Sequence, residues 1–223
     1  MNNAKWFPMT INLNQTRYRI MLVIVWTSVL YIGYILTNRF QFFTPHSLPM
    51  TALDNTIPFL PWTIAPYLLL ISGMYLFAFI DNVDDFIAAL VALTIAVCIN
   101  YTIYVVYPTT YPRPALPGPD ILGSGLYHWL VSIDTPSNCL PSGHITTPAI
   151  GCWYLARHHK TWRPYLFSTF FLLSLTTLTT KQHYVIDIPA GLLTAAIGIV
   201  IANTLVLSDK YNLTCVRRYW KDS

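Results

Sequence analysis

Long apolar stretches separated by short polar segments dominate this 223-residue chain. A helix needs about 20 apolar residues to cross the hydrocarbon core of a bilayer, and six stretches approach that length. They are residues 20–38, 55–80, 86–107, about 144–156, 164–180 and 184–207. The second stretch contains three prolines, so we expect its helix proper to begin near Ile64. The pattern predicts an all-α fold, a polytopic membrane bundle of six transmembrane helices.

The composition favours a membrane protein and argues against several soluble classes. Charged residues make up 10% of the chain and apolar residues 54%, whereas about a quarter of the residues in a typical soluble domain are charged. So few charges cannot cover the surface of a soluble fold of this size. The formal net charge of +4 is small for a nucleic-acid-binding domain, and we expect no nucleic acid partner. No internal repeat is visible, so residues 1–223 are expected to form a single membrane-embedded domain.

The distribution of Lys and Arg predicts the orientation, because basic residues concentrate in cytoplasmic loops. With six spans, ten of the 13 basic residues fall on the side of the N-terminus, and Arg39, Arg113 and Lys181 fall on the other. The ten are Lys5, Arg17, Arg19, Arg157, Lys160, Arg163, Lys210, Arg217, Arg218 and Lys221. Both termini of this multi-pass cell-membrane protein are therefore expected in the cytoplasm. The longest loop, about residues 108–143, is expected outside, and with it an active site at the outer face.

Three segments carry the candidate chemistry. They are Tyr-Pro-Arg-Pro at residues 111–114, Pro-Ser-Gly-His at 141–144 and Lys-Gln-His-Tyr-Val-Ile-Asp at 181–187. The second begins the fourth predicted span and the third begins the sixth. Two membrane crossings lie between them, so both are expected on the outer side, where the first segment already lies. Segments about 70 residues apart in sequence are therefore predicted to converge.

The residue types in these segments suit a phosphate group. A helix N-terminus offers unpaired backbone N–H groups and a partial positive charge. We expect Ser142 to be an N-cap and hydroxyl donor, and Gly143 to let an oxyanion approach the backbone. Arg113 presents a planar fork of donors for two phosphate oxygens, and Lys181 adds a positive charge beside the same place. These four residues are the predicted phosphate ligands.

His183 and Asp187 are predicted to act together, because Cβ atoms four residues apart on a helix are separated by about 6 Å. The Asp187 carboxylate can accept the Nδ1 proton of His183 and leave Nε2 free as a nucleophile. His144, at the other helix start, is expected to protonate the leaving oxygen. The reaction would then proceed in two steps through a phosphohistidine, with no metal and no other cofactor.

Plainer interpretations stay open beside these. A histidine at a membrane interface can simply be solvated, and two His with an Asp can bind a metal, although the adjoining Arg and Lys favour an anion. Arg113 can serve as a headgroup anchor, Lys181 can extend its ammonium to the interface, and Ser142 can be only an N-cap. His128 and Asp134 in the outer loop are interpreted as solvated residues.

On these residues the chain resembles the type 2 phosphatidic acid phosphatase superfamily of six-span membrane enzymes. That family has the signatures Lys-x6-Arg-Pro, Pro-Ser-Gly-His and Ser-Arg-x5-His-x3-Asp. The second is complete at residues 141–144, while the first keeps Arg113 and Pro114 but has Val106 in place of its Lys. The resemblance implies a nucleophile, its orienting partner, an acid/base and three phosphate ligands: His183, Asp187, His144, Arg113, Ser142 and Gly143, respectively.

The third signature departs from the family pattern in an informative way. His183 and Asp187 are kept, but Thr176 and Thr177 stand where the family has Ser-Arg. Lys181 is a candidate replacement for one of the two missing cations, at Val106 and Thr177. The Lys-Gln-His-Tyr-x-x-Asp form is similar to the branch that contains inositol phosphorylceramide synthases and related lipid phosphotransferases.

Residues and resemblance together predict a metal-independent integral-membrane lipid phosphatase, with its catalytic motifs within residues 106–187. It would release phosphate from a lipid phosphomonoester or diphosphate. One alternative is a lipid phosphotransferase that moves a phospho-headgroup to a lipid or sugar hydroxyl. Another is a transporter or lipid-binding membrane scaffold. The expected partners are a lipid phosphate substrate and membrane lipids, and the sequence predicts no particular oligomeric state.

Overall fold

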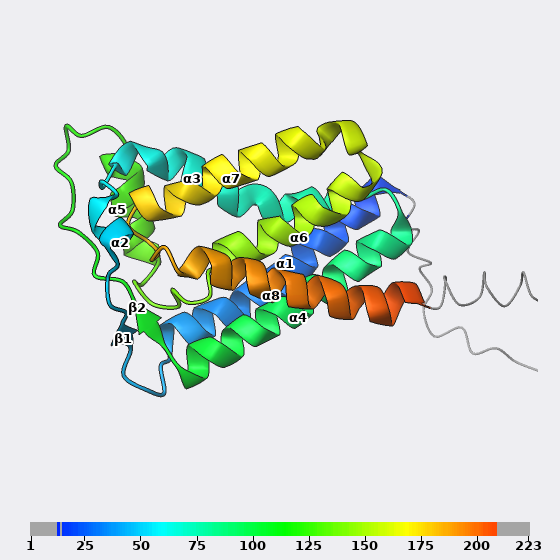
Figure 1. Cartoon of the computed structure of the whole chain (residues 1–223), viewed down its shortest axis with the longest axis horizontal. Helices are drawn as coiled ribbons and strands as arrows, with labels where there is room; N and C mark the ends of the chain where they lie inside the picture. Colours follow the sequence, from blue (N-terminus) through cyan, green and yellow to red (C-terminus); the bar gives the residue numbers. More distant parts are fainter. Residues whose placement is uncertain (1–12, 14, 209–223) are drawn as a thin grey trace, which may run out of the picture.

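The computed structural model describes residue 13 and residues 15–208, which fold almost entirely into helices that run along one long axis (Figure 1). The long helices are α1 (Thr16–Arg39), α4 (Val83–Val106), α6 (Gly143–His158), α7 (Arg163–Thr179) and α8 (Asp187–Ala202), which continues as the π-helical η4 (Asn203–Leu207). A further rod is composite, with 3-10 turn η1 (Pro61–Thr63), α3 (Ile64–Ile71) and 3-10 helix η2 (Ser72–Phe79). The predicted all-α class is confirmed, and α3 begins at the predicted Ile64.

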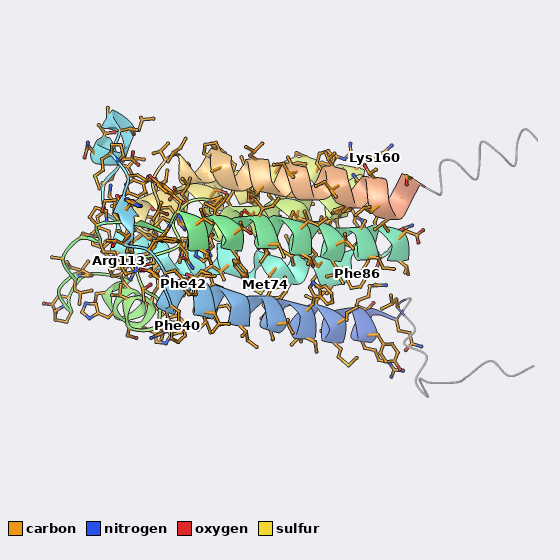
Figure 2. The ribbon with its side chains drawn as sticks, turned by 90° about the horizontal axis from the view of Figure 1, so that it is seen from below. Phe40, Phe42, Met74, Phe86, Arg113 and Lys160 are labelled. Carbon is orange, nitrogen blue, oxygen red and sulfur yellow. The ribbon has the colours of Figure 1, made fainter. Side chains whose placement is uncertain are left out.

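Short elements gather at one end of the bundle (Figure 1). They are β1 (His46–Ser47), α2 (Ala52–Thr56), β2 (Thr109–Thr110) and α5 (Ser124–Ile133), whereas the 3-10 turn η3 (Lys160–Trp162) joins α6 to α7. The strands pair in parallel, with His46 opposite Thr109. Figure 2 shows Arg113 at this end and Lys160 toward the other. We call the end with β1, β2, α2 and α5 the loop end; α1 begins, and the continuous α8–η4 helix ends, at the opposite end (Figure 1).

Within residues 15–208, four helical segments are long and apolar enough to cross a membrane, which makes the chain a multi-pass membrane protein. They are Thr16–Arg39, Pro61–Phe79, Val83–Val106 and Asp187–Leu207. The other two predicted spans correspond to α6 and α7, which have 16 and 17 residues. At 1.5 Å per residue these rise by about 24 and 26 Å, less than the hydrocarbon thickness of about 30 Å. The prediction of six spans is therefore borne out for four.

The long helices differ in how much of their surface the protein covers. Only 6% of the apolar window of α1 is buried, against 50% for α4. The apolar side chains along α1 are mostly exposed and would face lipid in a bilayer. In contrast, α4 lies in the centre of the core. Its buried alanines and leucines pack against α8 and α6.

Two glycines let α8 approach its neighbours closely. A Cβ on Gly198 would lie 2.5 Å from the carbonyl oxygen of Ala92 in α4, and one on Gly191 would lie 2.6 Å from that of Ser142 at the start of α6. Both obstacles are backbone atoms, which cannot rotate away. Close packing at Gly191 brings the first turn of α8 beside the first turn of α6.

The sequence pattern missed α5, which lies within the stretch expected to be one long loop. Tyr127 and Leu130 of this helix are buried against Ile64 and Tyr67 of α3. The helix begins after Gly123, whose φ of 85° is left-handed and suits glycine. Ten residues are too few to stand out as a membrane span, so α5 depends on its apolar contact with α3.

Replacing Gly191 by alanine is expected to destabilise the fold by about 1–3 kcal/mol, because α8 must move away from the Ser142 carbonyl. The control is Gly125→Ala in α5, where an added Cβ meets nothing within 4 Å. Thermal unfolding in detergent is the measurement. Equal midpoints for both variants would contradict the close approach of α8 to α6.

Candidate active site

The second and third predicted segments meet at the loop end, where α6 and α8 begin. Ser142 occupies the N-cap position of α6, Gly143 and His144 form its first turn, and Asp187 is the first residue of α8. His183 lies in the turn between α7 and α8 rather than in the helix itself. The Ser142 N–H donates to the Asp187 carbonyl oxygen at 3.2 Å, which ties the two helix starts together.

Two acceptors face Nδ1 of His183. The Asp187 Oδ2 atom and the Cys139 carbonyl oxygen each lie 3.0 Å from it. Because neither can donate, the imidazole proton belongs on Nδ1, and Nε2 carries the lone pair. The Tyr184 N–H donates to the same Asp187 oxygen at 2.9 Å, so a fully buried carboxylate is held by two donors.

Nε2 of His183 points at the start of α6. The Ser142 hydroxyl lies 3.2 Å from it, close enough to donate a hydrogen bond to the lone pair. Ser142 makes no side-chain capping bond, so it stands at the N-cap position but directs its hydroxyl to the histidine. The Cβ that Gly143 lacks would lie 3.5 Å from the Tyr104 hydroxyl, an ordinary contact distance.

The two histidine rings lie edge to face. Their centroids are 5.4 Å apart, and the other side of His144 meets Tyr67 at 5.3 Å in the same kind of contact. Tyr67 in turn packs against α5, so α5 supports the position of His144 through Tyr67. Among the residues that the structure describes, no group of three or more His, Cys or Asp side chains is arranged to hold a metal ion.

Arg113 brings the first segment to the same region through residue 182. Its Nη2 donates to Gln182 Oε1 at 2.7 Å, one residue before His183. Nη1 donates to the Asp134 carbonyl oxygen at 2.7 Å, and Nη2 also reaches the Asp134 carboxylate at 3.3 Å. Nε is buried and has no partner among the described residues.

The interpretation of Asp134 as a solvated loop residue is wrong. Its carboxylate pairs with Arg113 and accepts a 2.7 Å hydrogen bond from the Tyr34 hydroxyl of α1. Burial raises the pKa of this carboxyl, although both partners oppose that shift. The position of Asp134 in a long polar loop does not reveal this contact, because the contact with Tyr34 forms only when the loop folds back over α1.

Lys181 points to a different partner from the one expected. Its ammonium donates to the carbonyl oxygen of Asp54 in α2 at 2.9 Å. The Asp54 carboxylate accepts the Val185 N–H at 2.8 Å and closes a capping box with Thr51. Sequence reasoning missed Asp54, although the Thr-x-x-Asp spacing of a capping box is visible in the chain. α2 thus holds the turn that carries His183.

The two positions where the family signature has further cations carry no charge here, although the Thr177 carbonyl oxygen accepts the Gln182 N–H at 3.1 Å. Val106, at the end of α4, is 66% exposed. Thr177 is buried and donates to the Ser174 carbonyl oxygen of its own helix at 2.7 Å. Neither side chain supplies a charge to the candidate site, and Arg113 is the guanidinium that binds the turn of residues 181–186.

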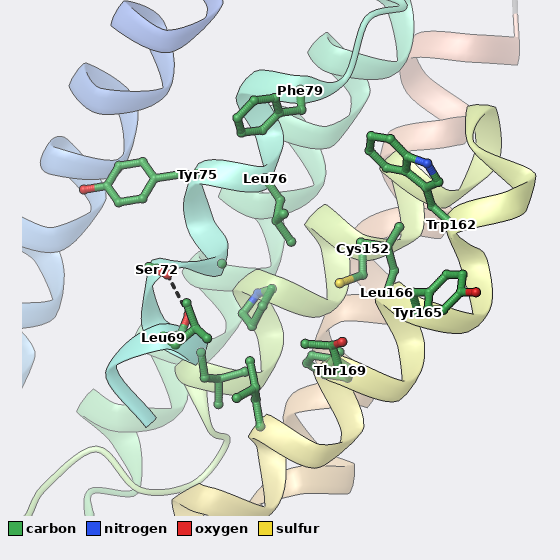
Figure 3. Close-up of a pocket in the computed structure, with 15 residues that line it drawn as sticks. Leu69, Ser72, Tyr75, Leu76, Phe79, Cys152, Trp162, Tyr165, Leu166 and Thr169 are labelled. Atoms are coloured by element: carbon green, nitrogen blue, oxygen red, sulfur yellow. Dashed lines mark hydrogen bonds between the residues drawn. The ribbon is translucent and has the colours of Figure 1, made fainter. Parts of the chain in front are cut away.

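Two of the cavities formed by the described residues lie in the helical body. The larger, of about 620 Å³, is lined mostly by apolar side chains of α3, η2, α6 and α7, and Figure 3 shows Leu76, Cys152 and Leu166 around it. None of the predicted site residues lines it. The smaller, of about 130 Å³, is lined in part by Gly143 and His144 and therefore adjoins the site.

Asp54→Asn is expected to lower the thermal midpoint at pH 7 by an amount equivalent to about 1–2 kcal/mol. Burial alone would raise the pKa of Asp54, but hydrogen bonds from Thr51 and Val185 lower it below its usual value. The carboxylate therefore stabilises the fold above its unfolded pKa of about 4, and this stability is lost as the pH falls through the lower folded pKa. Thermal unfolding in detergent is the measurement. The difference in midpoint between the unmutated protein and Asp54→Asn should be smaller at pH 3 than at pH 7. A deficit of the same size at both pH values, or an equal deficit in exposed Asp120→Asn, would contradict this role.

Comparisons with known proteins agree with the geometry. Neither a curated protein nor a solved structure matches the chain. A sequence model described as the PAP2 superfamily matches residues 62–201, a range that includes all three candidate segments. Membership implies phosphatase or phosphotransferase activity on phosphate-containing substrates, typically without a metal. Because the match covers more than half of the 223 residues, the chain belongs to the PAP2 superfamily of membrane phosphatase-like proteins.

Proposed function

We propose that the protein is an integral-membrane lipid phosphatase that releases phosphate from a lipid phosphomonoester or diphosphate, with His183 as nucleophile. One observation carries this proposal. Asp187 and the Cys139 carbonyl hold the His183 proton on Nδ1, while Nε2 faces the N-terminus of α6. A lone pair aimed at an anion-binding helix start is the arrangement that attack on a phosphate requires.

In the first step, His183 Nε2 forms a bond to phosphorus while the bond from phosphorus to the lipid oxygen breaks. His144 donates a proton to that leaving oxygen, so a phosphomonoester leaves as the lipid alcohol and a diphosphate leaves as the lipid monophosphate. The Asp187 carboxylate stabilises the positive charge that develops on the imidazole of His183. In the second step water attacks phosphorus, His144 takes its proton, and the N–P bond breaks to release phosphate.

The phosphate oxygens are assigned to Ser142, Gly143 and Arg113. The Ser142 hydroxyl can turn from Nε2 to an oxygen of the bound phosphate, and the unpartnered Nε–H of Arg113 provides a further donor. Lys181 is the fourth proposed ligand, and its contact with Asp54 supports a second role in holding the catalytic turn. Charge-assisted donors of this kind stabilise the charge that accumulates in the transition state.

We further propose six membrane spans, a site on the extracytoplasmic side of the cell membrane, and both termini in the cytoplasm. The site and the ends of the described chain lie at opposite ends of the bundle (Figure 1). α6 and α7 run between the same two ends and would complete six crossings if their flanking turns lie in the interface. Five of the ten basic residues assigned to the cytoplasm lie outside the described residues, as do the ends of the proposed 1–223 domain.

Hydrolysis and transfer share the first step and differ only in what attacks the phosphohistidine. A lipid or sugar hydroxyl in place of water would make the protein a phosphotransferase, and the Lys-Gln-His-Tyr form supports that alternative. A transporter or lipid-binding scaffold is the alternative of another class. It receives less support, because the ion pairs among the described residues lie at the two ends of the bundle rather than along a path through it.

His183→Ala is expected to reduce phosphate release from a lipid phosphate in detergent by at least a thousandfold, because no other group can form the intermediate. His144→Ala should also lower it strongly. His159→Ala is the control, since this residue stacks on Trp162 at the far end of the bundle. Activity should persist in a chelator. Full release by the His183 variant would refute the mechanism, and lipid binding without any turnover by the intact protein would favour the scaffold.

Ser142 presents a competing mechanism, because Ser142, His183 and Asp187 also form a chain in which the histidine could activate the hydroxyl. We expect Ser142→Ala to slow release by about 10–100-fold without abolishing it, as loss of one phosphate donor would. Phosphate trapped on the His144→Ala protein should be lost in acid and kept in alkali, as the N–P bond requires. An acid-stable label that disappears in Ser142→Ala would instead identify serine as the nucleophile.

A further inference from the structure

One residue in the wall of the small cavity beside the site has a buried hydrogen-bond acceptor without a partner. The cavity holds about 130 Å³ between α1, the α3–η2 rod, α4 and α6, and Gly143 and His144 form part of its wall. Asn100 of α4 also lines it and is only 1% exposed. Its Oδ1 has no hydrogen-bond partner among the described residues. A buried acceptor without a donor is unfavourable, so each such atom calls for an explanation.

The neighbouring hydrogen bonds fix which way the Asn100 amide points. Nδ2 lies 3.2 Å from the Thr146 hydroxyl oxygen. The Thr146 hydroxyl has its own acceptors, the carbonyl oxygens of Ser142 at 3.0 Å and Gly191 at 3.1 Å. Thr146 therefore accepts from the amide NH₂, and Oδ1 is the atom left over.

Most of the other hydroxyl groups in the wall are already committed as donors, and those of Tyr31 and Thr147, which also line the cavity, make no hydrogen bond to Asn100 Oδ1. Four of them give their protons to acceptors elsewhere: Thr27 to Val23 O, Tyr34 to Asp134 Oδ1, Tyr101 to Leu30 O and Tyr104 to Pro141 O. Turning any of these toward Asn100 would break an existing bond. The donor that Oδ1 lacks is thus best supplied by a molecule that enters the cavity.

The depth of Asn100 matches the part of a lipid next to its phosphate. Asn100 contacts Thr146, which lies two residues further into α6 than His144, about 3 Å along the helix axis. A cavity of about 130 Å³ has room for the linking atoms beside a phosphate.

We propose that this cavity receives the segment of an amphiphile next to the reacting phosphate, and that Asn100 Oδ1 accepts a hydrogen bond from a hydroxyl or amide N–H there. The inference rests on the proposed function, because it takes the phosphate to lie at His183. Ester oxygens can only accept, so they would leave Oδ1 unpaired. The site should therefore favour lipids with a donor group near phosphorus. That donor belongs either to the phosphorylated lipid or to a second lipid whose hydroxyl receives the phosphoryl group.

The test compares three short-chain 1-O-alkyl-glycerol 3-phosphates that have a free 2-hydroxyl, a 2-O-methyl ether or no oxygen at carbon 2. Binding is titrated on the full chain in detergent in a His183→Ala background, so that no turnover is needed. We expect the free hydroxyl to bind about tenfold more tightly than either analogue, as one hydrogen bond allows. Adding Asn100→Leu should remove this preference by weakening only the hydroxyl lipid. Met74→Leu, which changes an apolar wall residue, should keep it.

A second arm uses phosphate-free 1-O-alkyl-glycerol. Equal binding of the three phosphates, together with Asn100-dependent binding of this alcohol, would assign the donor to an acceptor lipid. No dependence on Asn100 in either arm, or an equal loss for all lipids in the variant, would overturn the proposal. Asn100→Ala serves if the leucine variant does not fold. Asn100-dependent selectivity without phosphate release or transfer by the unmutated protein would refute only the proposed function, and release without that selectivity would refute only this inference.

Discussion

The site depends on how one buried carboxylate is kept paired. Asp187 is fully buried at the start of a membrane helix, where an unpaired charge is costly. Its Oδ2 accepts from His183 Nδ1 and from the Tyr184 N–H in the turn just before α8, whereas Oδ1 has no partner among the described residues. The same contacts fix the orientation and the tautomer of the imidazole. The contacts that stabilise the start of α8 are therefore also the contacts that orient the His183 imidazole.

The rest of the bundle can be understood as support for that pair. Close packing at Gly191 places the N-terminus of α6 against α8, and the Ser142 N–H bonds the backbone of Asp187. From the outside, α2 binds Val185 and Lys181 through Asp54. Arg113 is positioned by Asp134, which is itself held by Tyr34 of α1. Elements far apart in the sequence each fix one side of the same small volume.

Much of this arrangement could be predicted from the chain, and the limits have physical causes. Counting membrane crossings was enough to bring residues 141–144 and 181–187 together, because parity does not depend on exact helix boundaries. The short helix α5 and the burial of Asp134 could not be read in this way, since both arise from how a long loop packs on α1 and α3. Lys181 was assigned to phosphate from its charge and its place beside His183, and the sequence pattern did not reveal its contact with the carbonyl oxygen of Asp54 in α2.

The central claim is that His183 Nε2 is the atom that bonds to phosphorus. A structure of the protein with vanadate, which adopts the geometry of a phosphoryl group in transfer, tests it most directly. The account predicts vanadium bonded to Nε2 of His183, with the His144 ring on the opposite side and Arg113 and the first turn of α6 around the equatorial oxygens. Vanadium bonded to Ser142 Oγ, or bound away from both histidines, would contradict it.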